Sequence, residues 1–176
     1  MAMAISILAE TDHRMKKNKT GVGVSTLYAG TSDFMPIIEE RIRAGHSVEI
    51  AVRGKSMRPL LKEGRDSVIL SPITKELKKY DIPLYKRLRG GYVIHRTLGL
   101  FVGGYTMIGD NQFAYEKGIK EEQIIAVVTA IKRRGRVIPI TRIDMRLYAV
   151  IWHFTRPLRH LPIRVLGRLK RIVERK

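Results

Sequence analysis

Short runs of alternating or apolar residues, separated by turn residues, fill the middle of this chain and limit its fold more than any other feature. Runs of this length, bounded by glycine, proline or polar residues, are typical of β-strands. Six segments are predicted as strands: residues 47–52, 67–70, 82–85, 91–98, 100–108 and 124–132. Hairpin turns are predicted at the glycine pairs 90–91 and 103–104 and at residues 133–136. The sequence therefore predicts a mostly β domain of several antiparallel strands.

A short helix is predicted before the first strand. Ser32 or Asp33 is suited to cap its N-terminus, and Gly45 is the stop signal after Ala44. Its apolar residues recur at helical spacing and share one face. They are Phe34, Ile37, Ile38 and Ile42.

The pattern changes again beyond Asp144. Large apolar residues are mixed with arginine there, and Pro157 and Pro162 divide the segment into two predicted short basic amphipathic helices. The chain is long enough, at 176 residues, for one domain of ordinary size with some additional sequence. We therefore expect a flexible leader over residues 1–31, one domain over 32–140 and a basic amphipathic helical tail over 141–176.

Most of the net charge of +18 lies in the last quarter of the chain, which carries +12 (14 minus 2). From Lys132 onward there are 14 Lys or Arg residues and only two acidic ones, Asp144 and Glu174. Such a segment favours nucleic acid or an anionic membrane surface as a partner. Few aromatic residues lie between the arginines, which disfavours nucleic acid. Arginine with large aliphatic residues fits a helix lying on an anionic membrane surface, and a basic helix packed on the domain is the alternative.

The composition excludes several classes of protein. The chain has no cysteine, which excludes a disulfide framework, a thiolate metal site and a cysteine nucleophile, and favours an intracellular location. The longest candidate membrane span, residues 148–166, is interrupted by arginines and prolines. Residues 1–9 are apolar but lack the basic start of a secretory signal. We therefore expect a cytoplasmic protein without a membrane span, with peripheral membrane contact through its tail as an option.

Histidine is the only remaining strong metal ligand besides the carboxylates. The five histidines, at positions 13, 46, 95, 153 and 160, are scattered, and no metal-ligand cluster is visible. No glycine-rich phosphate loop occurs either. We expect no metal ion and no cofactor.

Ser56 is the first candidate for chemistry. It follows a predicted strand in the turn Gly54-Lys55-Ser56, and Pro59 begins a helical turn just after it. This arrangement would present Ser56 at the mouth of a sheet with its backbone N–H exposed. A serine hydroxyl is a poor nucleophile unless a base takes its proton. The structural alternative is a serine that caps the following turn.

His95 is the strongest candidate for that base. It lies in the predicted strand 91–98, where alternation puts it on the same face as Val93. The alternative is a histidine satisfied within the core. Lys55 and Lys86 are weaker candidates, because Lys86 belongs to a basic run that a solvated face explains better.

Five short motifs occur in a familiar order. They are Gly54-Lys55-Ser56-Met57-Arg58-Pro59, Gly64-Arg65-Asp66-Ser67-Val68, Tyr80-Asp81-Ile82, His95-Arg96 and Gly109-Asp110-Asn111. Together they resemble the catalytic domain of type I signal peptidases, in a superfamily that also includes the self-cleaving repressors of the DNA-damage response. The resemblance covers about residues 34–135, and it implies a signal-peptidase-like β domain.

The resemblance implies a role for each matching residue. Ser56 would be the nucleophile, with its backbone N–H holding the oxyanion, and Met57 and Gly54 would lie in the substrate groove. His95 stands where bacterial signal peptidases have a lysine, as in the endoplasmic-reticulum and archaeal types. A histidine needs no deep desolvation to act as a base near neutral pH. Asp110 would support the imidazolium, and its alternative role is that of a turn residue.

The sequence also departs from the family pattern. Gly54 replaces a serine that helps to hold the oxyanion in many members. The second acidic position of the endoplasmic-reticulum type has Tyr115-Glu116 as its nearest equivalent. Signal peptidases are membrane-anchored, whereas the sequence pattern leads us to expect no anchor here. Asp66 and Asp81 match the pattern, but turn chemistry at strand entries accounts for both.

The expected function is that of a serine endopeptidase. It would cleave a leader or signal-like peptide through a Ser–His dyad and an acyl-enzyme, with a peptide or protein as its substrate. One alternative is a self-cleaving regulator, suggested by the Ala29-Gly30 and Ala44-Gly45 bonds upstream of the serine. The other alternative is a non-catalytic module that binds a peptide or a membrane.

Overall fold

The computed structural model describes residues 31–158. The chain divides after Ile140 into two compact units, residues 1–140 and residues 141–176. The predicted leader, apart from Thr31, and the second basic helix predicted beyond Pro162 lie outside the described residues.

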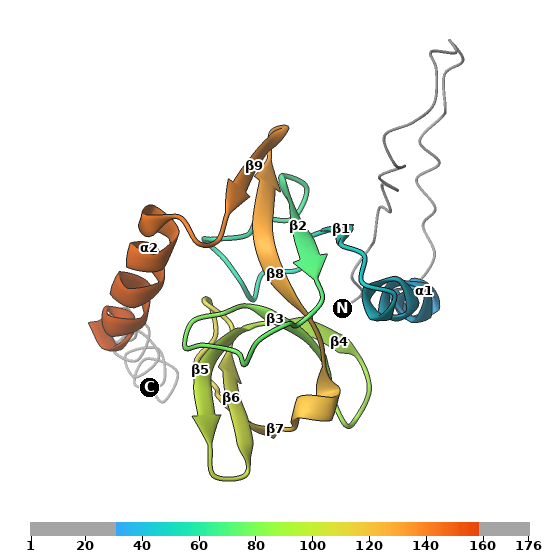
Figure 1. The fold of residues 1–176 in the computed structure, drawn as a ribbon. Helices are drawn as coiled ribbons and strands as arrows, with labels where there is room; N and C mark the ends of the chain where they lie inside the picture. The colour runs from blue at the N-terminus through green and yellow to red at the C-terminus, as the bar shows by residue number, and fades with distance from the viewer. Residues whose placement is uncertain (1–30, 159–176) are drawn as a thin grey trace, which may run out of the picture. The chain divides into compact units, whose positions relative to one another are not determined.

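The first unit is built from two antiparallel sheets, so the predicted mostly β fold is confirmed (Figure 1). The larger sheet has the order β1-β2-β8-β3-β4, with β9 paired to β8. The smaller sheet has the order β5-β6-β7. The strands of the larger sheet are β1 (Val48–Ala51), β2 (Asp66–Ser71), β3 (Pro83–Lys86), β4 (Tyr92–Ile94), β8 (Ile124–Arg133) and β9 (Arg136–Pro139). The others are β5 (Arg96–Phe101), β6 (Gly104–Ile108) and β7 (Glu116–Ile119), with a 3-10 helix, η1 (Glu121–Gln123), before β8.

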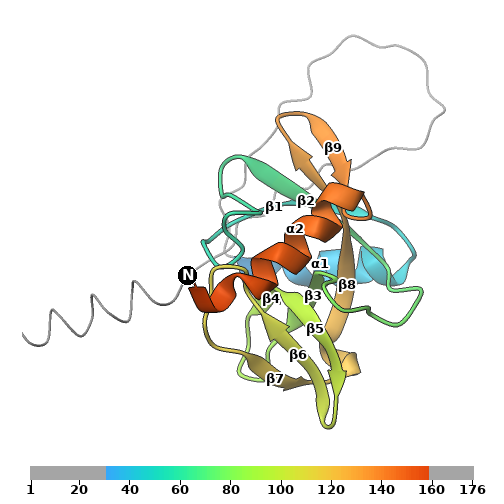
Figure 2. The same cartoon turned by 90° about the vertical axis from the view of Figure 1, so that its left-hand side faces the viewer.

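The long strand β8 lies at the centre of the larger sheet and pairs with more strands than any other. It pairs with β2, β3 and β9, and β9 and the β5–β7 sheet lie at opposite ends of it in both views (Figure 2). In β2 the residues Asp66, Val68 and Leu70 are buried, while those between them are half-buried. This is the alternation expected of a strand with one face in the core.

A buried cluster joins the two sheets. It brings Tyr85 of β3 together with Tyr105 and Met107 of β6 and Ile119 of β7. Tyr85 and Met107 are completely buried. Because β3 and β6 belong to different sheets, this cluster fixes the position of one sheet against the other.

The predicted hairpin turns are present. Gly90 and Gly91 separate β3 from β4, and residues 133–136 form the tip between β8 and β9. The turn between β5 and β6 needs glycine for two reasons. Gly104 has a φ of +129°, and a Cβ there would lie 2.7 Å from the carbonyl oxygen of Ile119.

The prediction of one continuous strand over residues 91–98 is wrong, because the strand is interrupted at His95. β4 ends at Ile94 and β5 begins at Arg96, so His95 is the single residue between strands of different sheets. The predicted strand 100–108 is likewise a hairpin formed by the end of β5 and by β6. Strand β7 was not predicted, because Glu116-Lys117-Gly118-Ile119 has no apolar alternation.

Helix α1 (Thr31–Arg43) precedes the sheets. It begins at Thr31, so the predicted caps Ser32 and Asp33 fall inside it. Its buried residues are Met35, Ile38 and Ile42, which lie one turn apart, whereas Ile37, predicted for the core face, is 45% exposed.

The predicted stop of α1 at Gly45 is confirmed. Gly45 has a φ of +87°, and its N–H donates to the carbonyl of Ile42. The next N–H, of His46, reaches back to the carbonyl of Arg41. These two bonds form a Schellman motif, which satisfies carbonyl groups in the last turn of the helix.

In the second unit, helix α2 spans Ile143–Phe154, and residues 156–158 are helical again after a turn at Thr155. Tyr148 and Trp152, four residues apart, stack with ring centroids separated by 5.6 Å. In the described range of residues, no helix combines the length and the apolar character required to cross a membrane.

Candidate functional site

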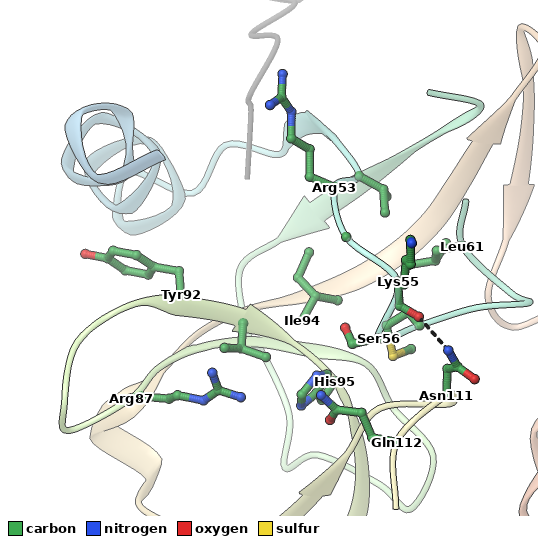
Figure 3. Close-up of a pocket in the computed structure, with 14 residues that line it drawn as sticks. Arg53, Lys55, Ser56, Leu61, Arg87, Tyr92, Ile94, His95, Asn111 and Gln112 are labelled. Carbon is green, nitrogen blue, oxygen red and sulfur yellow. Dashed lines mark hydrogen bonds between the residues drawn. The ribbon is translucent and has the colours of Figure 1, made fainter. Parts of the chain in front are cut away.

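A cavity of about 420 Å³ contains most of the residues that the sequence singles out (Figure 3). Ser56, Met57, Gly54 and His95 all line it. Asn111, from the Gly-Asp-Asn motif, also lines it. The other lining residues are Val52, Arg53, Lys55, Leu61, Arg87, Tyr92, Val93, Ile94 and Gln112. The cavity therefore has an apolar wall and a set of polar groups from three separate chain segments.

Ser56 lies in a turn that is held by its neighbours. The N–H of Arg58 donates to the carbonyl of Lys55, and the N–H of Leu61 donates to the carbonyl of Met57. Ser56 itself is half-buried, and neither its hydroxyl nor its N–H is hydrogen-bonded to any residue in the range 31–158. A capping serine would accept a bond from a backbone N–H. The geometry thus favours a serine available to a ligand over a capping one.

The Gly-Asp-Asn loop packs directly behind this turn. The N–H of Asn111 donates to the carbonyl of Ser56 at 2.8 Å, and its side-chain amide donates to the carbonyl of Lys55 at 3.3 Å (Figure 3). A Cβ on Gly109 would lie 2.6 Å from the carbonyl oxygen of Ser56. Only glycine allows this close approach, so Gly109 determines how tightly the loop supports the serine.

His95 is buried, with an exposed fraction of 1%, and its polar contacts are made through one ring nitrogen, Nδ1. Its Nδ1 lies 3.1 Å from the hydroxyl of Tyr85 and 3.2 Å from Oε1 of Glu116. Nε2 has no hydrogen-bond partner among the described residues. A proton on Nδ1 can be donated to the Glu116 carboxylate, which leaves the lone pair on Nε2 for proton transfer.

Glu116 is anchored as an anion. The Arg87 guanidinium donates to both of its oxygens, from Nε to Oε2 at 2.8 Å and from a terminal nitrogen to Oε1. Burial acts to raise the pKa of Glu116, but hydrogen bonds from Arg87, His95 and Tyr85 outweigh it and hold the pKa well below its usual range. The carboxylate that faces His95 therefore stays charged at neutral pH.

Tyr85 is the second group on His95. Burial, together with the charge of Glu116, raises the pKa of its hydroxyl far above the usual value. The phenol therefore stays protonated at neutral pH, with its hydroxyl 3.1 Å from Nδ1 of His95. Tyr85 lies opposite Val93 in the β3–β4 pairing, two residues before His95.

Asp110 forms a separate buried ion pair. Its two oxygens accept bonds from Arg96, at 2.8 and 2.9 Å, and Arg96 also donates to the carbonyl of Tyr80. Because Arg96 directly follows His95, this pair anchors the backbone beside the imidazole. The carboxylate that lies beside Nδ1, at the place of an orienting group, is that of Glu116.

The five sequence motifs form a connected network. The N–H of Val52, at the edge of the serine turn, donates to the carbonyl of Asp66. Asn111 bonds the serine turn, Asp110 bonds Arg96, and Arg96 bonds Tyr80, while the N–H of Thr97 donates to the carbonyl of Asp81. Hydrogen bonds between the motifs thus join segments up to 56 residues apart, with Lys55 and Asn111 as the most distant pair.

The structure also shows the positions of the other predicted site residues, Met57, Gly54, Lys55 and Lys86. Met57 is 4% exposed in the cavity wall, and Gly54 has a φ of +84° and donates its N–H to Glu63. That N–H is therefore not available to an oxyanion. Lys55 is exposed beside Ser56, whereas the ammonium of Lys86 lies over the ring of Tyr92.

Two carboxylates of the shared pattern have structural partners. Asp66 accepts bonds from Arg65 and Arg133, and although burial acts to raise its pKa, these bonds lower it to about 2. Asp81 accepts the N–H of Lys78 within a turn. Both therefore stabilise strand entries, as the sequence indicates.

Two residues of the site have no sequence signal that marks their role. The pattern predicts Tyr85 only as a strand residue, and it places Arg87 in a basic run that a solvated face explains. Glu116 was noted only as the nearest equivalent of a second acidic position. Its spacing six residues after Asp110 was the available signal.

Comparison with protein-family models, with curated protein sequences and with solved structures finds no match to this chain. Between residues 31 and 158, no group of three or more histidine and carboxylate side chains is arranged to hold a metal ion. The assignment of a function therefore depends on the geometry of the cavity and on the ordered motifs.

Proposed function

We propose that this chain is a serine endopeptidase resembling type I signal peptidases, with Ser56, His95 and Glu116 as its catalytic group. One observation carries the proposal. A buried histidine has its Nδ1 on an anchored carboxylate, and it lines the same cavity as a serine whose hydroxyl is not engaged elsewhere in the described chain. This is the arrangement of base, orienting group and nucleophile that acyl transfer needs.

The reaction follows from these positions. Nε2 of His95 takes the proton of the Ser56 hydroxyl while Oγ bonds to the scissile carbonyl carbon. The Ser56 N–H donates to the oxyanion, and the Glu116 carboxylate stabilises the imidazolium. The imidazolium then returns the proton to the leaving amine, which leaves an ester on Ser56. Water hydrolyses that ester with His95 again as the base.

Asp110 has a supporting role in this proposal. Its bidentate pair with Arg96 holds the chain on the C-terminal side of His95, at the junction between the two sheets. The predicted role on the imidazolium passes to Glu116. Arg87 acts through Glu116, because it donates to the carboxylate, whereas the Tyr85 hydroxyl contacts Nδ1 of His95 directly.

Self-cleavage at Ala44-Gly45 gains no support from the structure. The N–H groups of both residues bond to carbonyls of α1, in the motif that ends the helix. A peptidase binds its substrate as an extended strand, so the end of α1 would have to unwind first. Ala29-Gly30 lies outside the described residues.

The proposal is tested with a peptide library of mixed sequence, with the products read by mass spectrometry. The full-length chain should cleave a subset of peptides, and Ser56→Ala and His95→Ala should each abolish cleavage. Ser47→Ala is the matched control, because Ser47 is an exposed serine that bonds Ser71 and does not line the cavity. Cleavage that persists in both active-site variants would sink the proposal. Absence of any cleavage, with an unchanged intact mass, would favour a binding module.

A further inference from the structure

Helix α2 carries an apolar stripe that is exposed. The stripe consists of Ile143, Leu147, Val150, Ile151 and Phe154, with exposed fractions from 37% for Val150 to 85% for Ile143. At 3.6 residues per turn these five positions fall within about 100° of the helix circumference. The stripe is therefore continuous along the whole helix, and it does not arise from scattered surface residues.

Cations border this stripe on one side. Arg142 and Arg146 lie one helical turn apart, next to the stripe, and both are exposed. Arg142 is bonded to Asp144, the only acidic residue of the helix. Residues 141–176 contain ten Lys or Arg residues and two acidic ones. Residues 141–176 thus combine the apolar face of α2 with a net charge of +8 (ten minus two).

The charge of the chain narrows the choice of partner. A second copy of residues 141–176 would carry the same net charge of +8, and the first 140 residues are also basic, with 24 Lys or Arg against 14 acidic residues. Like charges oppose both of these contacts. Nucleic acid would match the charge but would leave the apolar stripe in water. An anionic lipid surface offers negative headgroups above an apolar interior.

The length of α2 determines how it can meet a bilayer. Its 12 residues extend about 18 Å, well short of the hydrocarbon thickness of about 30 Å. A helix of this length with one apolar face lies in the plane of the interface. The arginine side chains can then extend toward the headgroups while their aliphatic parts cover the stripe edge.

We propose that α2 is an interfacial anchor, which docks this protein on an anionic lipid bilayer with its apolar stripe buried at the boundary between headgroups and acyl chains. The inference is independent of the peptidase proposal. It concerns a separate unit of the chain, and it would hold if Ser56 proved unreactive.

The test is flotation of the full-length protein with vesicles. Vesicles of phosphatidylglycerol and phosphatidylcholine should carry the protein upward, and vesicles of phosphatidylcholine alone should carry much less. Raising the salt from about 0.1 M to about 1 M should weaken binding, because it shortens the range of the electrostatic attraction. The double variant Leu147→Asp/Phe154→Asp should lower the partition coefficient at least about tenfold.

A matched control separates the stripe from general exposure. Leu100 and Phe101, at the tip of the β5–β6 hairpin, are each more than half exposed, like Leu147 and Phe154. Leu100→Asp/Phe101→Asp should leave flotation unchanged. Equal binding to both vesicle types, or unchanged binding of the Leu147→Asp/Phe154→Asp variant, would overturn the proposal. So would a dimer in solution that this variant dissociates without any flotation of the parent protein.

Discussion

The two carboxylates near His95, half-buried Glu116 and buried Asp110, have different roles. Glu116 contacts Nδ1 and is held by Arg87, whereas Asp110 is paired with Arg96 in a nearly inaccessible position. A carboxylate on the imidazole acts on the transition state, because it fixes the tautomer and stabilises the developing positive charge. A carboxylate that neutralises a buried arginine acts on the folded state.

Isosteric amides should therefore separate the two carboxylates. Glu116→Gln should lower the rate of acylation of Ser56 by roughly 10²- to 10⁴-fold, since an amide cannot stabilise the imidazolium. Asp110→Asn should lower the free energy of unfolding by about 3–5 kcal/mol, because it leaves the buried Arg96 unneutralised. Acylation kinetics and urea denaturation of both variants measure the two effects. An unchanged acylation rate in Glu116→Gln would remove Glu116 from the catalytic group.

At the scale of elements, the loop after β6 is the support of the serine turn. Gly109 brings this loop against the carbonyl of Ser56, and Asn111 bonds the same carbonyl. No other part of the site depends so directly on the absence of a side chain.

Two glycine variants distinguish local support from general stability. Gly109→Ala should displace the loop from Ser56, lower the acylation rate at least about tenfold and cost about 1–3 kcal/mol of stability. Gly104→Ala creates a clash of the same kind, 2.7 Å from the carbonyl of Ile119, at the far hairpin. It should destabilise the protein without slowing the remaining folded molecules. An equal loss of acylation rate in Gly109→Ala and Gly104→Ala, compared at the same folded fraction, would contradict a specific role of Gly109 in supporting Ser56.

The elements that sequence predicts well are those with a local signal. The burial alternation of β2 and the glycine stop of α1 can be read from neighbouring residues, and both are present. The break at His95 has no such signal, because the residues on either side continue a strand-like pattern. The chain changes sheets there because Arg96 is drawn to Asp110 and Tyr80, which are distant in sequence.

The candidate site likewise contains residues that a local sequence signal marks and residues that no local signal marks. Ser56 and His95 could be predicted because motifs mark them, and both line the cavity. Glu116 is 21 residues from His95 and belongs to a strand without apolar alternation. Its contact with His95 depends on how β7 pairs with β6 and on how the smaller sheet meets Tyr85, which neither propensity nor periodicity encodes.

At the scale of the whole molecule, the two units divide the proposed work. The first unit brings residues of three motifs, Ser56, His95 and Asn111 among them, to one cavity, and the second carries the apolar stripe of α2. A peptidase that docks on an anionic bilayer would meet substrates at the membrane surface. The two proposals nevertheless stand on different residues, and each can fail without the other.

The central claim is that His95 activates Ser56, and the most direct measurement is the rate at which a fluorophosphonate phosphonylates Ser56 of the intact protein, with loss of fluoride. Mass spectrometry should locate a single adduct on Ser56, and His95→Gln should slow its formation at least about a hundredfold while the fold is retained. An adduct elsewhere, or equal rates for the parent protein and His95→Gln, would contradict the account.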